Sequence, residues 1–133
     1  MNLPLLVITV LLLAFVIVKV LAARPRISPA AALDAIEHHG AILIDVREPH
    51  EWTGGVAAPA VLLPLSDLRH GRKQWGPFLD QHRDRKLLLY CHSGMRSGGA
   101  ATALRREGFD AINVGSLSTW TGAGLPTRRP EAA

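Results

Sequence analysis

Cysteine is scarce in this sequence, because Cys91 is the only one among 133 residues. A single cysteine cannot form an internal disulfide, so a disulfide-stapled fold is excluded, and a lone thiol suits a reducing compartment. Aromatic residues are also few, at 5%, and no basic stripe interleaves them, so a nucleic-acid partner is not indicated. The six histidines lack the spacing of metal ligands, and we expect neither a metal nor another cofactor.

Charge is absent from residues 3–18, and no acidic residue precedes Arg24. We therefore expect residues 1–23 to form a transmembrane helix. Its apolar run is about 31 Å long at a rise of roughly 1.5 Å per residue, against a hydrocarbon core of roughly 30 Å. The alternative is a cleaved signal peptide, which the small residues Ala22 and Ala23 would suit. Against it, the run is long and no basic residue precedes it.

Basic residues follow the apolar run. Lys19, Arg24 and Arg26 lie at its C-terminal side, and the positive-inside rule then places the amino terminus outside and the rest of the chain in the cytoplasm. The prediction is a single-pass protein of a bacterial inner membrane with a cytoplasmic domain, and the alternatives are a periplasmic domain or a cleaved signal peptide. Residues 24–27 form a short junction that keeps the domain near the bilayer. The formal net charge of +4 suits an anionic leaflet.

We expect residues 28–128 to form one α/β domain and residues 129–133 to form a flexible tail. Continuous apolar runs predict buried parallel strands at residues 41–46, 61–65, 86–90 and 111–114. Ser28 is a good N-cap and Gly40 a good C-terminal stop for a first helix. Further helices are expected over residues 74–81, over residues 100–107 and around Trp120. Strands that alternate with helices indicate a central, mostly parallel sheet.

The segment with the clearest chemistry surrounds Cys91. It follows the buried strand 86–90 and precedes a helix expected to start near residues 97–100, and small residues between them let the backbone curl. Backbone N–H groups and a helix N-terminus at such a corner favour a thiolate over a thiol and attract anions. We therefore expect Cys91, at the mouth of this loop, to be the catalytic nucleophile. The expected substrate-binding residues are His92, Ser93, Gly94, Met95, Arg96 and Ser97. The alternative is a buried structural cysteine.

Residues 91–96 resemble the six-residue active-site loop of the rhodanese (thiosulfate sulfurtransferase) domain family. Residues 42–52, 62–68 and 108–127 are similar to three further signature segments of that family, in the same order. The resemblance covers about residues 26–128. It departs from the family pattern at residues 55–60 and at Gly115-Ser116.

The resemblance implies a rhodanese-like three-layer domain with a central sheet. It also implies that Cys91 takes the sulfane sulfur of thiosulfate or another persulfide donor, holds it as a persulfide and passes it to a thiol acceptor. Arg96 and the loop N–H groups would neutralise the anionic end of the donor. Neither a metal nor a cofactor is implied.

Two other functions fit parts of the pattern. Cysteine-dependent phosphatases and arsenate reductases use a related loop, but theirs is one residue longer than the four residues between Cys91 and Arg96. The other alternative is a non-catalytic, membrane-tethered binding module on the same scaffold, although such modules usually lack the cysteine. Asp45 and Arg47 follow the first strand beside the site. We interpret them as an ion pair that braces the loops, with a supporting contact to the substrate as the alternative.

Overall fold

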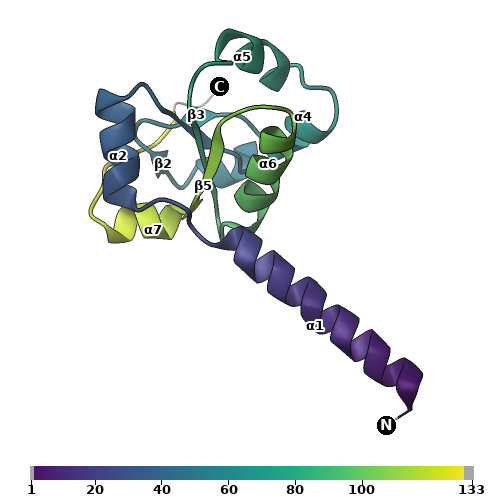
Figure 1. Cartoon of the computed structure of the whole chain (residues 1–133). Coiled ribbons are helices and arrows are strands. Elements are labelled where there is room, and N and C mark those ends of the chain that lie inside the picture. Colours follow the sequence, from purple (N-terminus) through teal and green to yellow (C-terminus); the bar gives the residue numbers. More distant parts are fainter. Residues whose placement is uncertain (1, 131–133) are drawn as a thin grey trace.

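The first element is a long helix that contacts the domain near its C-terminal end. A computed structural model of the chain describes residues 2–130, and in it helix α1 (Leu3–Ala23) begins after the N-cap Asn2, whose Oδ1 accepts a hydrogen bond from the Leu5 N–H at 3.1 Å. The helix projects away from the rest of the molecule, and none of its residues is buried (Figure 1). The predicted helix is thus confirmed. Its length and composition are compatible with membrane anchoring, and a signal sequence has the same features.

Four parallel strands form the central sheet, in the order β3-β1-β4-β5. They are β1 (Ile42–Asp45), β3 (Val61–Leu62), β4 (Leu87–Cys91) and β5 (Ala111–Ser116). The predicted α/β class and parallel sheet are confirmed. Because the strands are parallel, their carboxyl ends meet at one edge of the sheet, and Asp45 and Cys91 both lie there.

Three of the four strands differ in length from the prediction, and β1 is one residue shorter at each end than the predicted run 41–46. β3 stops at Leu62, because Pro64 has no N–H to donate and helix α4 (Leu65–Arg69) begins directly after it. β5 runs to Ser116 rather than to Val114, because a bulge shifts its register against β4. Gly115 makes this bulge possible with a φ of +105°, which side chains rarely tolerate.

Helices cover both faces of the sheet, which confirms the three-layer arrangement (Figure 1). One face carries α4, α5 (Trp75–Gln81) and α6 (Met95–Arg106), and the other carries α2 (Pro29–His38) and α7 (Leu117–Gly122). Each face has its own buried core, one containing Trp75 and the other Trp120. β4 contributes alternate residues to the two cores, as a strand between two layers must.

Several short elements were not predicted. They are α3 (Pro49–Trp52), α4, and an antiparallel pair formed by β2 (Val56–Ala57) and β6 (Thr127–Arg128). The Arg128 side chain secures this pair, donating hydrogen bonds to the carbonyl oxygens of Ala58 and Ala60 at 3.0 and 2.8 Å. The tail expected over residues 129–133 follows β6 directly, and its last three residues lie outside the described part of the chain.

Helix α6 begins at Met95, earlier than the predicted start near residues 97–100. Gly94 is its N-cap and has a φ of +88°, so the chain turns from β4 into the helix within three residues. Arg96 and Ser97 therefore belong to the first turn of the helix rather than to a loop before it. This early start brings the first helical N–H groups close to Cys91.

Candidate active site

Cys91 lies at the corner where β4 ends and α6 begins. Its Sγ accepts hydrogen bonds from the Gly94 N–H at 3.0 Å, from the Ser97 N–H at 3.5 Å and from the Ser97 hydroxyl at 3.3 Å. Two backbone donors and a hydroxyl thus converge on one sulfur at the start of a helix. All three groups are donors, and an anionic acceptor forms stronger hydrogen bonds with such donors than a neutral one does.

The Cys91 side chain is more deeply placed than expected. The sequence suggested a cysteine at an open loop mouth, whereas the residue is fully buried and packs in the core beneath α6. The cause is that β4 extends through Cys91 and that the following turn folds over the sulfur, with Gly94 and Ser97 in contact with it. The residue is buried, but its sulfur is surrounded by polar donors as well as by apolar atoms.

The six loop residues have different placements. His92, Ser93 and Met95 are exposed, Arg96 is half-buried, and Gly94 and Ser97 are buried. Within residues 2–130, only Gly94 and Ser97 of this loop donate hydrogen bonds to Cys91 Sγ. His92, which the sequence analysis named as a substrate-binding residue, thus lies on the exposed side of the turn.

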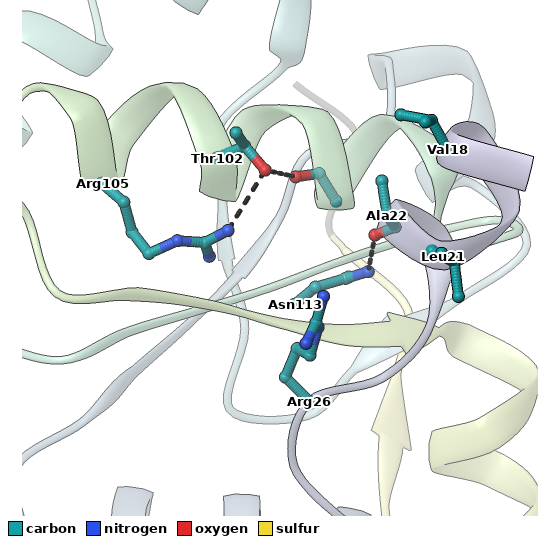
Figure 2. Close-up of a pocket in the computed structure, with 8 residues that line it drawn as sticks. Val18, Leu21, Ala22, Arg26, Thr102, Arg105 and Asn113 are labelled. Carbon is teal, nitrogen blue, oxygen red and sulfur yellow. Dashed lines mark hydrogen bonds between the residues drawn. The ribbon is translucent and has the colours of Figure 1, made fainter. Parts of the chain in front are cut away.

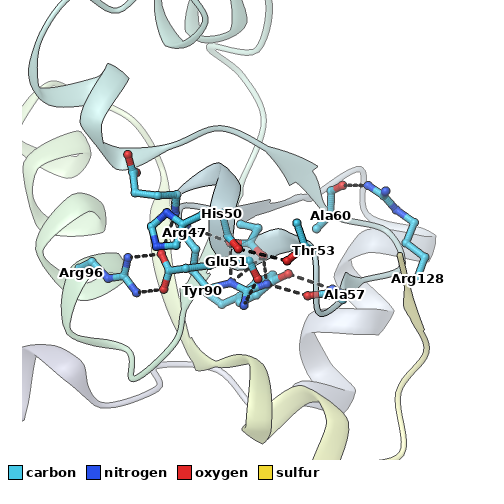
Figure 3. Close-up of polar contacts among 12 residues, drawn as sticks. Arg47, His50, Glu51, Thr53, Ala57, Ala60, Tyr90, Arg96 and Arg128 are labelled. Carbon is cyan, nitrogen blue, oxygen red and sulfur yellow. Dashed lines mark hydrogen bonds and ion pairs between the residues drawn. The ribbon is translucent and has the colours of Figure 1, made fainter. Parts of the chain in front are cut away.

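Arg96 is paired with a residue that the sequence did not single out. Its guanidinium donates to both oxygens of Glu51, at 2.7 and 2.8 Å, and Glu51 also accepts the N–H of Glu48 at 2.8 Å (Figure 3). The hydrogen bond from Arg96 lowers the pKa of Glu51 from 4.5 to about 2, and the Glu48 N–H adds to the effect. The Glu51 carboxylate therefore holds the arginine over the cysteine loop. The signal in the sequence was only a glutamate in a short, unpredicted helix.

Asp45 and Arg47 form the bracing pair that was preferred on the sequence. Arg47 is buried and donates to both oxygens of Asp45, with the shortest contact at 2.8 Å. It also donates to the backbone carbonyls of Glu51 and Gly55, at 3.2 and 2.8 Å (Figure 3). The pair thus connects the end of β1 to α3 and to the turn before β2. The Arg47 guanidinium donates to protein acceptors, and its bond to the Glu51 carbonyl helps to hold Glu51 in place.

Asn113 of β5 is a second residue that the sequence analysis missed. Its Oδ1 accepts the Ser97 hydroxyl at 2.7 Å and the Gly115 N–H at 3.0 Å. Its Nδ2 donates to the Gly94 carbonyl at 3.1 Å and, on α1 and its junction, to the carbonyls of Ala22 at 3.2 Å and of residue 24 at 3.3 Å. A continuous set of hydrogen bonds therefore joins the cysteine corner to the end of α1. The sequence indicated this residue only as an amide side chain within the otherwise apolar predicted strand 111–114.

A shallow hollow of about 250 Å³ lies beside the cysteine corner. Arg69, His70 and Arg96 supply its basic side chains, and Glu48, Leu65 and Ser66 complete the lining. No group of three or more His, Cys, Asp or Glu side chains placed to hold a metal ion occurs among residues 2–130. The described side chains around the site offer a thiol, hydrogen-bond donors and the basic groups of Arg69 and His70, together with Arg96, which is paired with Glu51, and the carboxylate of Glu48.

Comparison with known proteins agrees with this arrangement. The chain matches the family model described as a rhodanese-like domain over residues 28–123. A crystal structure of a rhodanese-related protein from Thermoplasma volcanium superposes with a TM-score of 0.67 at 29% sequence identity, covering 80% of this chain and all of that one.

Two relatives are similar to this sequence over most of its length. A protein named thiosulfate sulfurtransferase GlpE, from Actinobacillus pleuropneumoniae, is 30% identical over 104 residues, which are 76% of this chain and 90% of that protein. The uncharacterized protein slr1261 from Synechocystis is 37% identical over 109 residues, and the match covers 80% of this chain but 58% of that longer protein. The chain belongs to the rhodanese-like domain family, and it carries the domain behind one apolar N-terminal helix.

Proposed function

We propose that the protein is a sulfurtransferase that carries sulfane sulfur as a persulfide on Cys91. The observation that supports this most directly is the set of three donors, from Gly94 and Ser97, that surround the sulfur. These donors stabilise the thiolate, which is the nucleophilic form of cysteine. A relative named as a thiosulfate sulfurtransferase makes thiosulfate the natural first donor to test.

In the first half-reaction the Cys91 thiolate attacks the outer sulfur of thiosulfate. The sulfur–sulfur bond of the donor breaks, sulfite leaves with the electron pair, and a new sulfur–sulfur bond forms on the enzyme. The anionic end of the donor is attracted by the basic hollow at Arg69, His70 and Arg96. Because Cys91 is fully buried, the exposed residues of the turn, His92 and Ser93, must move aside for the donor to enter, while Gly94 stays against the sulfur.

In the second half-reaction an acceptor thiolate attacks the outer sulfur of the persulfide. The enzyme sulfur leaves with its electron pair, which regenerates the Cys91 thiolate, and the acceptor becomes a persulfide. Cys91 is the only cysteine of the sequence, so no second cysteine of this chain can displace the sulfur as an internal disulfide. Discharge therefore depends on an external thiol.

Cyanide offers a simple assay of this transfer. With thiosulfate as donor, the wild type should release thiocyanate, and Cys91→Ser should fall to the uncatalysed background. Thr121→Ala, an exposed change on α7 outside the cysteine loop and the hollow, is the control and should retain activity. Equal thiocyanate release by the wild type and by Cys91→Ser would refute the proposal.

Helix α1 serves, in the same proposal, as a membrane anchor that leaves the domain in the cytoplasm. The helix exposes apolar side chains along its whole length, and basic residues follow it at Arg24 and Arg26. Protease added to inverted inner-membrane vesicles should digest the domain, whereas protease added to intact spheroplasts should leave it whole. The reverse pattern would place the domain outside, and a chain that lacks α1 in the membrane fraction would show a cleaved signal.

A further inference from the structure

A second cavity lies away from Cys91, where the end of α1 meets α6 and β5. Its volume is about 220 Å³, smaller than the roughly 300–1,000 Å³ that holds a drug-sized ligand. Val18 and Leu21 of α1 form one wall, and Thr102 and Arg105 of α6 form another (Figure 2). The proposed sulfur chemistry uses none of these four residues.

The polar side of this cavity is basic. Arg26 and Arg105 reach toward it from two sides, and none of the described residues that line it is acidic (Figure 2). Arg105 donates to the Ala111 carbonyl at 2.8 Å and to the Thr102 hydroxyl at 3.1 Å, so part of its five-donor guanidinium stays free. Arg26 is exposed, and its side chain has no hydrogen-bond or ion-pair partner within residues 2–130. Two guanidinium groups that lack an acidic partner suit a phosphate.

The apolar side of the cavity belongs to the last turns of α1. Val18 and Leu21 are exposed, and Leu21 lies within one turn of the helix end at Ala23. A helix of this length matches the hydrocarbon core, so its last turn lies at the depth of the lipid headgroups. At that depth a ligand meets apolar atoms on the α1 side and guanidinium groups on the domain side.

We propose that this cavity binds the phosphate of an anionic phospholipid, with the acyl chains lying along Val18 and Leu21. The inference rests on the proposed membrane anchoring of α1 and not on the sulfur chemistry. A phospholipid, unlike free phosphate, satisfies both the basic and the apolar sides of the cavity. The bound headgroup fixes the domain relative to the bilayer, because Arg26 lies on the junction and Arg105 on the domain.

The structure offers a closely matched control for a test. Arg24 and Arg106 are exposed, lie two and one residues from Arg26 and Arg105, and do not line the cavity. The double variants Arg26→Gln with Arg105→Gln, and Arg24→Gln with Arg106→Gln, lose the same charge from the same segments. Arg26 and Arg105 face the cavity, whereas Arg24 and Arg106 do not. Arg105 also donates to the Ala111 carbonyl and the Thr102 hydroxyl, so the folding of its variant is checked separately.

Native mass spectrometry of the full chain in detergent measures the binding directly. The wild type and the Arg24/Arg106 variant should retain one phosphatidylglycerol, and the Arg26/Arg105 variant should bind it about tenfold more weakly. Phosphatidylcholine with the same acyl chains should bind weakly to all three proteins, and glycerol phosphate should not bind. An equal loss of phosphatidylglycerol affinity in both double variants would show general attraction to the basic surface. Phosphatidylcholine binding as tight as that of phosphatidylglycerol would show that the contact is apolar only. Tight binding of glycerol phosphate would show a free-anion site. Each of these three results would overturn the proposal.

Two checks keep the result interpretable. If circular dichroism shows that the Arg26/Arg105 variant is unfolded, the lipid affinities of the single variants Arg26→Gln and Arg24→Gln are compared instead. Both side chains are exposed, so neither change should unfold the protein. An equal affinity of these two single variants would then reject the site. The intact mass of the membrane-extracted chain reports whether α1 is retained. Its absence would remove this inference together with the anchor, while thiocyanate release would still test the sulfur chemistry.

Discussion

The Ser97 hydroxyl has one hydrogen and three possible acceptors, of which the Gly115 carbonyl, at 3.4 Å, is the most distant. It lies 2.7 Å from Asn113 Oδ1 and 3.3 Å from Cys91 Sγ. While the cysteine is a thiol, the shorter contact to Asn113 takes the hydrogen. Once the cysteine is ionised, the hydroxyl turns to the sulfur, because a charged acceptor gives the stronger hydrogen bond. Ser97 thus acts as a donor that is held ready for the thiolate.

Ser97→Ala should slow the reaction of Cys91 with iodoacetamide at pH 7 about tenfold. A hydrogen bond to a charged group contributes roughly 1.5–3 kcal/mol, and about 1.4 kcal/mol corresponds to a factor of ten. Alkylation is followed by the mass of the intact chain, and Ser93→Ala, exposed in the same turn, should react like the wild type. Equal rates for Ser97→Ala and the wild type would show that the hydroxyl does not stabilise the reactive sulfur.

Glu51 should make the stability of the domain depend on acid. The hydrogen bond from Arg96 depresses the pKa of Glu51 to about 2 in the folded chain, from 4.5. A depressed folded pKa contributes stability that is present above the unfolded pKa and is lost as the pH falls from about 4.5 toward 2. The wild type should therefore exceed Glu51→Gln in free energy of unfolding at pH 7, and the difference should shrink over this range.

Urea unfolding at pH 7, 4 and 3 measures this difference. Glu37→Gln provides the control, because Glu37 is an exposed glutamate of α2 whose one ion pair within residues 2–130 is with the neighbouring, exposed His38. A difference between wild type and Glu51→Gln that stays constant with pH would mean that the pair with Arg96 does not form in solution.

At the scale of the elements, two adjacent glycines of α6 have very different surroundings. Gly98 lies at the contact with α1, and Gly99 does not. A Cβ added to Gly98 would lie 2.0 Å from the Ala22 carbonyl oxygen, whereas one added to Gly99 would find only the Arg69 side chain at 4.0 Å. Alanine at residue 99 should therefore stabilise α6 by about 0.5–1 kcal/mol through helix propensity. Alanine at residue 98 forces α1 away from α6 and should destabilise the protein by about 1–3 kcal/mol.

Thermal unfolding of the full chain in detergent compares Gly98→Ala with Gly99→Ala. Opposite shifts of the midpoint are expected, because the two changes are chemically identical and differ only in what the new methyl group meets. A Gly98→Ala protein that is as stable as Gly99→Ala would show that α1 does not rest on α6.

The elements that could be predicted from the sequence are those with a strong local pattern. The sequence predicts β1 and β4 from their apolar runs, and α2 from its terminal residues Ser28 and Gly40. Each of these signals lies within one segment of the chain. β2 and β6 were missed because each has two residues and pairs with a segment some 70 positions away. The early start of α6 depends on the left-handed Gly94, which the sequence marked only as a small residue.

The candidate site shows the same division between local and long-range information. The sequence identified Cys91 and its loop, because strand, cysteine and small residues are consecutive. It did not identify Glu51 or Asn113, which reach the site from α3 and β5 by way of the fold. The burial of Cys91 entered only through the alternative of a buried structural cysteine, since it depends on how the turn folds over the sulfur.

At the scale of the whole molecule, the central claim is that one sulfur carries the transferred atom. Because Cys91 is the only cysteine of the chain, its intact mass reports a persulfide without ambiguity about its position. The wild type treated with thiosulfate and freed of excess donor should gain roughly 32 Da, the gain should disappear on mild reduction, and Cys91→Ser should gain nothing. A wild type whose mass is unchanged by thiosulfate and by a low-molecular-weight persulfide donor, or a Cys91→Ser chain that gains the same mass, would contradict the account.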